Sequence, residues 1–240
     1  MRYIHTALYG PTTAPLWRNQ SIHLILDDAY DGLAETGGGE IKLSLKWVDG
    51  IRSSVERGEK GRAEAVNEFK GVLLHELVHT IQYDGGGTAP GWFIESLADY
   101  LRLQARLGPP HWRLAGQGRR ERGWEEAYDA GARFFAWLEG EGEADGSPSA
   151  ASQPHGAPPT PISPSVPAAQ PTRYPTHQSD PQPVVVKPKL SKPRIGPFKD
   201  LSQIMNLKLK EGKWDDGVWE ELTGKTLEDL WAEYLEWYKP

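Results

Sequence analysis

The stretch "GVLLHELVHTIQYDGGGTAPGWFIESLADYL" runs from Gly71 to Leu101 and begins with a helical pattern. His75 and His79 stand four residues apart in it, with Glu76 between them. The apolar residues of this segment share the other side of the predicted helix: Leu73, Leu74, Leu77, Val78 and Ile81. Because residues four apart on a helix face the same way, both imidazoles can reach one metal ion. Glu76 lies about a quarter-turn round, where it could contact a water molecule at that ion.

A catalytic zinc site needs a third protein ligand in addition to two histidines. A pattern with a third histidine six residues after the second does not fit, because Gly85 occupies that position and Asp84 lies one place off. Glu95 follows the glycine-rich break and is the better candidate. Asp99 lies one helical turn further on, where a carboxylate could bind the far nitrogen of a ligand histidine. This order resembles the gluzincin arrangement; the alternative interpretation is two amphipathic helices with solvated polar residues.

The secondary-structure pattern around this stretch predicts strands followed by helices. Strands are expected at 21–28 and at 40–48, where Ile41, Leu43, Leu45 and Trp47 alternate with polar residues. Residues 31–39 are expected to form a flexible loop between the strands. Helices are expected over about 62–83, 90–108, 122–138, 201–209 and 223–238, the last with Thr226 as its N-cap. This order predicts an α+β domain.

Residues 141–197 differ in composition from the rest of the chain. They contain 14 of the 20 prolines, with serine, alanine, threonine and glutamine between them. Such a segment buries too little apolar surface to offset its chain entropy, so we expect a disordered insertion. Residues 1–140 and 198–240 would then form a single domain. A docking motif for a partner is the alternative interpretation of the insertion.

Charge and composition argue against several classes of function. The formal net charge is −6, the pI is about 5.7, and there is no cysteine. The acidic balance argues against nucleic-acid and membrane-surface partners, and a zinc site must use His, Asp and Glu. Residues 1–20 lack the pattern of a signal peptide, and no apolar run is long enough to cross a bilayer. The localisation stays open.

The sequence resembles the basic secretory protein family, also called peptidases of plants and bacteria. The resemblance rests on "GVLLHELVHTIQYDGGGTAPGWFIESLADYLRLQARLGPPHW", "EAYDAGARFFAWLE" and "LTGKTLEDLWAEY", and covers about 21–139 and 198–238. It implies a zincin-like metallopeptidase fold, one zinc ion on His75 and His79, and Glu76 as the catalytic glutamate; the gluzincin pattern adds Glu95. Three features depart from the family: no export signal, only about 20 residues before the first strand, and an acidic charge.

The leading functional hypothesis is a monomeric zinc peptidase that acts on peptides or proteins. Glu76 would move a proton from water to the leaving amine, and the strand at 40–48 would pair with an extended substrate. An oxyanion donor is also needed, and Tyr128, His111 and Tyr100 are candidates, each with a packing role as its alternative. The alternative function is an inactive, zinc-stabilised binding or defence protein of the same fold. Hydrolysis of a substrate other than a peptide also stays open.

Overall fold

The computed structural model describes residues 1–11, 13, 21–140 and 197–239. A small sheet contains β1 (His23–Asp27), β2 (Ala34–Gly37) and β3 (Glu40–Ser44) in the order β1-β3-β2. Strand β1 runs parallel to β3, and β2 runs antiparallel to it. The predicted disordered insertion lies outside the described residues, apart from Pro197.

The strand predicted at 40–48 is wrong in its second half. β3 ends at Ser44, and α2 (Leu45–Glu56) begins at the next residue. The Ser44 hydroxyl accepts a hydrogen bond from the Trp47 amide at 3.3 Å, so it caps the helix at the point where an unbroken strand was expected. Trp47 stacks on Phe69, with ring centroids 6.0 Å apart. The loop predicted at 31–39 is also wrong, because β2 lies within it and pairs with β3.

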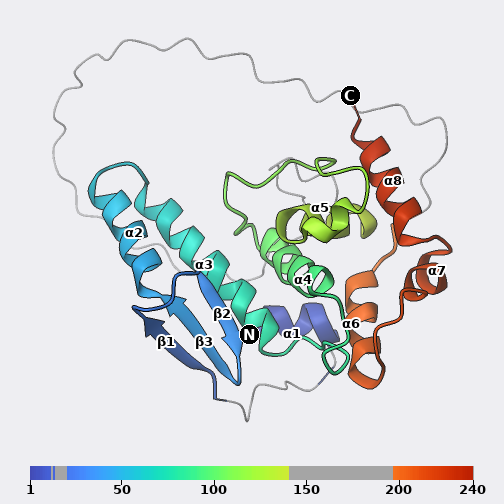
Figure 1. The fold of residues 1–240 in the computed structure, drawn as a ribbon, viewed down its shortest axis with the longest axis horizontal. Helices are drawn as coiled ribbons and strands as arrows, with labels where there is room; N and C mark the ends of the chain where they lie inside the picture. The colour runs from blue at the N-terminus through green and yellow to red at the C-terminus, as the bar shows by residue number, and fades with distance from the viewer. Residues whose placement is uncertain (12, 14–20, 141–196, 240) are drawn as a thin grey trace, which may run out of the picture.

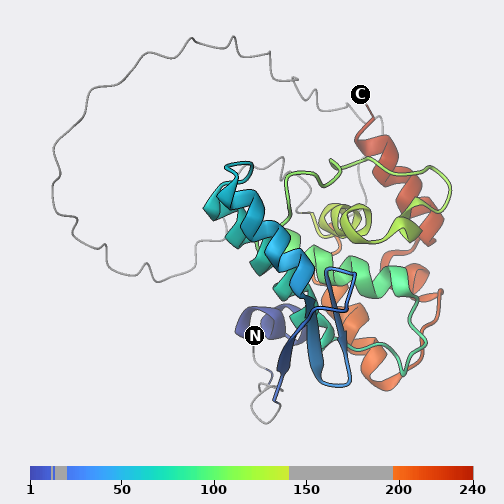
Figure 2. The same cartoon turned by 60° about the vertical axis from the view of Figure 1, so that its left-hand side comes forward.

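Helix α3 (Arg62–His79) lies between two hydrophobic cores. The smaller core contains Ile41 and Leu43 of the sheet together with Val72 of the helix. On another side, Val78 belongs to the larger core formed with the other helices. Figures 1 and 2 show α3 running between the sheet and the helical part of the molecule. The polar face of α3 is therefore fixed from both sides.

The larger core is formed by helices from both ends of the chain. These are α1 (Arg2–Tyr9), α4 (Gly91–Gln104), α5 (Tyr128–Leu138), α6 (Leu201–Glu211), α7 (Val218–Thr223) and α8 (Leu227–Trp237). The patterns did not predict α1, which lies against α6 (Figure 1). Ile4 and Leu8 are buried in this core, and the Asn206 amide donates to the Leu8 carbonyl at 3.1 Å. The Phe198 amide donates to the Leu138 carbonyl at 2.8 Å, which joins the two described segments on either side of 141–196.

Several predicted helix boundaries differ from the structure. α3 ends at His79 rather than at 83, and α4 ends at Gln104 rather than at 108. The helix predicted at 122–138 is divided into a 3-10 turn, η2 (Gly123–Glu126), and α5, because Ala127 and Tyr128 adopt φ of 54° and 42°. The cap at Thr226 is confirmed, since its hydroxyl accepts from the Asp229 amide at 3.1 Å.

The predicted α+β class is confirmed: the described residues form a mixed fold with a small three-stranded sheet and several helices. Among these residues, no helix combines the length and the apolar character that a bilayer crossing requires.

Candidate metal centre

His75, His79 and Glu95 converge between the end of α3 and the start of α4. The Nε2 atoms of His75 and His79 are 3.0 Å apart. Oε2 of Glu95 lies 3.0 Å from the first of these atoms and 3.7 Å from the second. Two ligand atoms at about 2.0–2.1 Å from one tetrahedral metal ion are about 3.3 Å apart. The three residues could therefore hold a metal ion.

The far nitrogens of both imidazoles are occupied by oxygen atoms. His75 Nδ1 lies 2.7 Å from Oδ1 of Asp99, and His79 Nδ1 lies 3.0 Å from Oε1 of Gln82. Oxygen acceptors hold the hydrogens on the Nδ1 atoms, so each neutral ring presents an unprotonated Nε2. Two nitrogen lone pairs and a carboxylate oxygen then face one another and repel. A positive charge at this point, either a proton or a metal ion, removes the repulsion.

The pKa values of the two coupled residues reflect the same need for positive charge. Burial disfavours the charged form of His75, but hydrogen bonds to the Asp99 and Glu95 carboxylates outweigh it and raise its pKa to about 9. Burial likewise disfavours the Glu95 carboxylate, yet hydrogen bonds with His75 and His79 lower its pKa to about 2. The raised pKa favours the doubly protonated form of His75 at neutral pH, and a metal ion bound at Nε2 would have to displace the proton there.

Glu76 lies beside this cluster and is only 6% exposed. Its Oε2 atom accepts a hydrogen bond from the Thr36 hydroxyl at 2.6 Å. Thr36 is on β2, which packs against α3. The sheet therefore holds the carboxylate of Glu76, the residue that follows His75.

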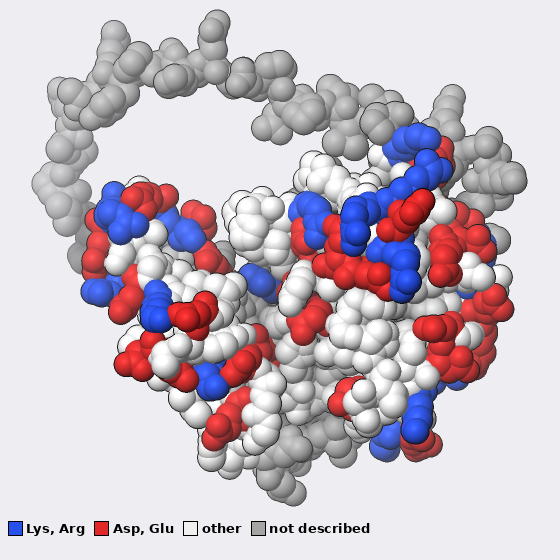
Figure 3. Space-filling view, viewed as in Figure 1, with Lys and Arg blue, Asp and Glu red and all other residues white. Residues whose placement is uncertain are grey.

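A cleft of about 740 Å³ opens over these residues. Ala34, Glu35 and Thr36 of β2 lie on one side of it, and α4 contributes Ile94 and Glu95. Figure 3 shows the surface hollowed between the sheet with α2 and the part of the chain around α5. Since β3 is the central strand, both of its edges are occupied, so the predicted substrate pairing at 40–48 is wrong. Among the described residues, β2 pairs with β3 alone, through one edge, and it lies at the cleft.

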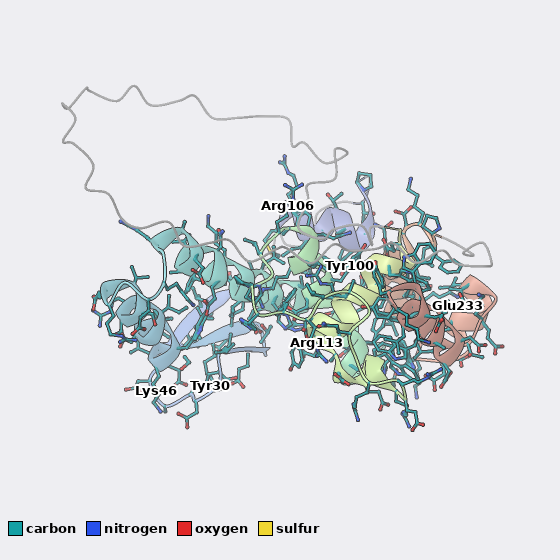
Figure 4. The ribbon with its side chains drawn as sticks, turned by 90° about the horizontal axis from the view of Figure 1, so that it is seen from above. Tyr30, Lys46, Tyr100, Arg106, Arg113 and Glu233 are labelled. Atoms are coloured by element: carbon teal, nitrogen blue, oxygen red, sulfur yellow. The ribbon has the colours of Figure 1, made fainter. Side chains whose placement is uncertain are left out.

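Two of the three predicted oxyanion donors line the cleft. Tyr128 is 52% exposed, and its ring stacks over His75 with centroids 6.3 Å apart. His111 lines the same cleft. Tyr100 does not line the cleft, because it is buried among the helices and its hydroxyl donates to Glu139 at 3.1 Å. Figure 4 shows Tyr100 among the helices and Tyr30 beside the sheet. The structure thus separates Tyr100 from the site because α4 turns that residue into the core.

The position of Tyr128 depends on strained backbone and on an ion pair. Positive φ at two consecutive non-glycine residues, Ala127 and Tyr128, costs on the order of 1–3 kcal/mol each and marks functional sites more often than others. Arg113 (Figure 4) binds the next residue, Asp129, with Nη2–Oδ1 2.8 Å and Nε–Oδ2 3.0 Å, and it also contacts Glu126. The segment that carries His111 is therefore fixed to the start of α5. Burial is the largest cause that raises the pKa of Tyr128, and the negative charge of Glu95 raises it further. The Tyr128 hydroxyl therefore stays protonated at neutral pH.

The sequence patterns did not indicate three residues that support the cluster. Thr36 binds Glu76, Gln82 binds His79, and Arg102 lies 3.6 Å from Asp99. Gln82 also donates to the carbonyl of Ile94 at 3.2 Å, next to Glu95. Its spacing of three from His79 could have identified it, because such residues are neighbours on a helical turn. Thr36 had no such local signal.

The structure thus defines a mixed α+β protein with a cleft and a candidate metal centre of two histidines and a glutamate. The family model described as peptidase of plants and bacteria matches residues 1–146, so the chain belongs to this family, the basic secretory protein family. The match confirms the resemblance and includes α1, and it does not extend to 198–238. No curated protein and no solved structure matched the chain.

Proposed function

We propose that this protein is a zinc-dependent metallopeptidase with a zincin-like fold. The observation that carries the proposal is the convergence of three ligand atoms within 3.7 Å of one another, beside the Glu76 carboxylate and inside a cleft. The family is named as a peptidase, which supports peptide bonds as the target. Residues 1–140 and 198–240 are proposed as one peptidase domain, supported by the packing of α1 against α6.

His75, His79 and Glu95 are the proposed ligands of one zinc ion. Two nitrogens and one carboxylate oxygen form a donor set that zinc uses in catalytic sites. A bound zinc ion would lower the pKa of a water molecule and polarise the peptide carbonyl. Asp99 and Gln82 hold the two imidazoles in the tautomer that presents Nε2 to the ligand position.

Glu76 is the proposed general base and acid. Its carboxylate would take a proton from water as the water oxygen attacks the carbonyl carbon, and would pass that proton to the leaving amine nitrogen. Tyr128 is the preferred oxyanion donor, because its ring lies over His75 at the cleft and its backbone is strained. His111 is the second candidate, from the same cleft. The edge of β2 that faces away from β3 would pair with the extended substrate, as a strand added to the sheet.

The test combines metal content with hydrolysis. Purified wild-type protein, His75→Ala/His79→Ala and Glu76→Gln are compared by metal mass spectrometry and by cleavage of a quenched-fluorescent peptide library. We expect about one zinc per chain in the wild type and in Glu76→Gln, none in the double variant, and hydrolysis by the wild type alone. Zinc without hydrolysis would favour the zinc-stabilised binding protein. No zinc after zinc addition would refute the ligand assignment.

A further inference from the structure

The Thr36 hydroxyl contacts Glu76 at two atoms. Its oxygen is 2.6 Å from Oε2 of the side chain and 3.1 Å from the main-chain carbonyl oxygen of the same residue. Thr36 pairs with Ile41 of β3, whose side chain is buried toward α3. The contact is long-range, since it joins residues forty positions apart. Both the carboxylate and the carbonyl are thus within hydrogen-bond distance of one hydroxyl.

A hydroxyl at this position can serve both protonation states of Glu76. It has one hydrogen to donate and two lone pairs to accept with. When Glu76 is ionised, the hydroxyl donates to the carboxylate, which is the shorter and charge-assisted bond. When Glu76 is protonated, the hydroxyl can turn its hydrogen to the carbonyl and accept from the carboxylic acid O–H. In each state the hydroxyl thus keeps one hydrogen bond to the Glu76 side chain.

We propose that Thr36 is a positioning residue that holds the Glu76 carboxyl group in one orientation through both proton transfers. The inference rests on the proposed function. In the first transfer an O–H bond of water breaks and an O–H bond forms on the Glu76 carboxylate, while the water oxygen bonds to the carbonyl carbon. In the second, the O–H bond on Glu76 breaks and an N–H bond forms on the amine, while the peptide C–N bond breaks. Thr36 gains and loses no proton in either step; only its hydroxyl rotates.

The place of Thr36 on β2 connects the base to the substrate. β2 is the strand whose edge away from β3 would receive the substrate backbone, and Ala34 and Glu35 line the same cleft. One strand would thus fix both the peptide bond and the carboxyl group that acts on it. A displacement of about 1 Å in such an alignment can lower a rate about 100-fold.

The test compares Thr36→Val, which keeps the shape and removes the hydroxyl, with Thr36→Ser, which keeps the hydroxyl. We expect Thr36→Val to lower kcat on the order of ten- to hundredfold, a part of the about 10²–10⁴ that a positioned base supplies, with little change in KM or zinc content. Thr36→Ser should restore most of kcat. Thr223→Val is the matched control, because its hydroxyl is also buried in a bond, to the Trp219 carbonyl at 2.6 Å, far from the cleft in α7.

A second measurement tests the contact without activity. Urea midpoints of the metal-free wild type, Thr36→Val, Glu76→Ala and the double variant form a cycle. We expect Thr36→Val to lower the midpoint when Glu76 is present and to have a much smaller effect in Glu76→Ala. The inference would be overturned if the changes in urea midpoint of the two single variants simply added in the double variant. It would also be overturned if kcat were unchanged in Thr36→Val, or if Thr36→Val and Thr36→Ser lost kcat equally. Absence of hydrolysis by the wild type would overturn the proposed function itself, which distinguishes the two failures.

Discussion

The pH dependence of metal binding provides a quantitative test of the His75–Asp99 contact. The pKa of His75 is raised to about 9 in the metal-free protein, whereas a metal ligand must be unprotonated. At pH 7, about two units lower, a zinc ion would have to displace a proton at a cost of roughly 3 kcal/mol. Zinc affinity should therefore be weaker at low pH, rise about tenfold per pH unit between pH 7 and 9, and level off above pH 9.

Asp99→Asn changes this dependence in two opposite ways. Asp99 is one of the two carboxylates that raise the pKa of His75, so its removal lowers that pKa and the proton competes less strongly at pH 7. The carboxamide also orients the imidazole less strongly, and loss of such a partner weakens metal affinity about 10- to 100-fold. We therefore expect the variant to bind zinc about 10- to 100-fold more weakly at pH 9. At pH 7 the two effects oppose each other, so the loss of affinity relative to the wild type should be smaller than at pH 9.

The assay is competition with a chromophoric zinc chelator at half-unit steps from pH 6.5 to 9.5. Asp31→Asn is the matched control, because it removes a carboxylate that binds Lys46 rather than a candidate ligand. The control should keep the wild-type slope. A flat wild-type profile between pH 7 and 9 would show that His75 is not protonated in the metal-free protein. If Asp99→Asn lost the same fraction of zinc affinity at pH 7 as at pH 9, the argument that the two effects oppose each other would be refuted.

Three further predictions concern the cleft and the core. Tyr128→Phe should lower kcat on the order of 10²–10³-fold with zinc retained, whereas Tyr100→Phe should leave kcat unchanged; both are measured by steady-state kinetics on the same peptide. Ala127→Gly should raise the free energy of unfolding by about 1 kcal/mol in urea, because glycine adopts φ of 54° without strain; a lower stability would argue against strain there. Leu8→Ala should lower the free energy of unfolding by about 2–5 kcal/mol, since Leu8 is fully buried, and a loss below 1 kcal/mol would mean that α1 is not part of the core.

The parts of the site that the sequence predicted are those with local signals. The spacing of four within α3 and within α4 determines which side chains share a face, so the approach of His75, His79 and Glu95 follows once the two helices pack. The interaction of Asp99 with a ligand histidine was predicted in the same way, and it lies 2.7 Å from His75. The functional roles of these residues stay predictions until metal and activity are measured.

The parts that the sequence did not predict depend on long-range pairing or on strain. β2 has the sequence Ala-Glu-Thr-Gly, which carries no strand pattern, and it becomes a strand by pairing with β3. In 40–48 the apolar alternation continues past Ser44, although that serine begins a helix. The break between η2 and α5 arises at Ala127, whose residue type does not favour a positive φ. In each case tertiary contacts outweigh the local preference.

The location of the candidate centre follows from the two cores that meet at α3. Val78 and the helices of the larger core determine where His75 lies relative to Asp99 and Glu95 on α4. Ile41, Leu43 and Val72 of the smaller core determine where β2 lies, and hence where Thr36 meets Glu76. Metal binding at the candidate centre would thus depend on one core, and the alignment of the proposed base would depend on the other. Because α3 is the only helix in both cores among the described residues, a shift of this helix would disturb both functions together.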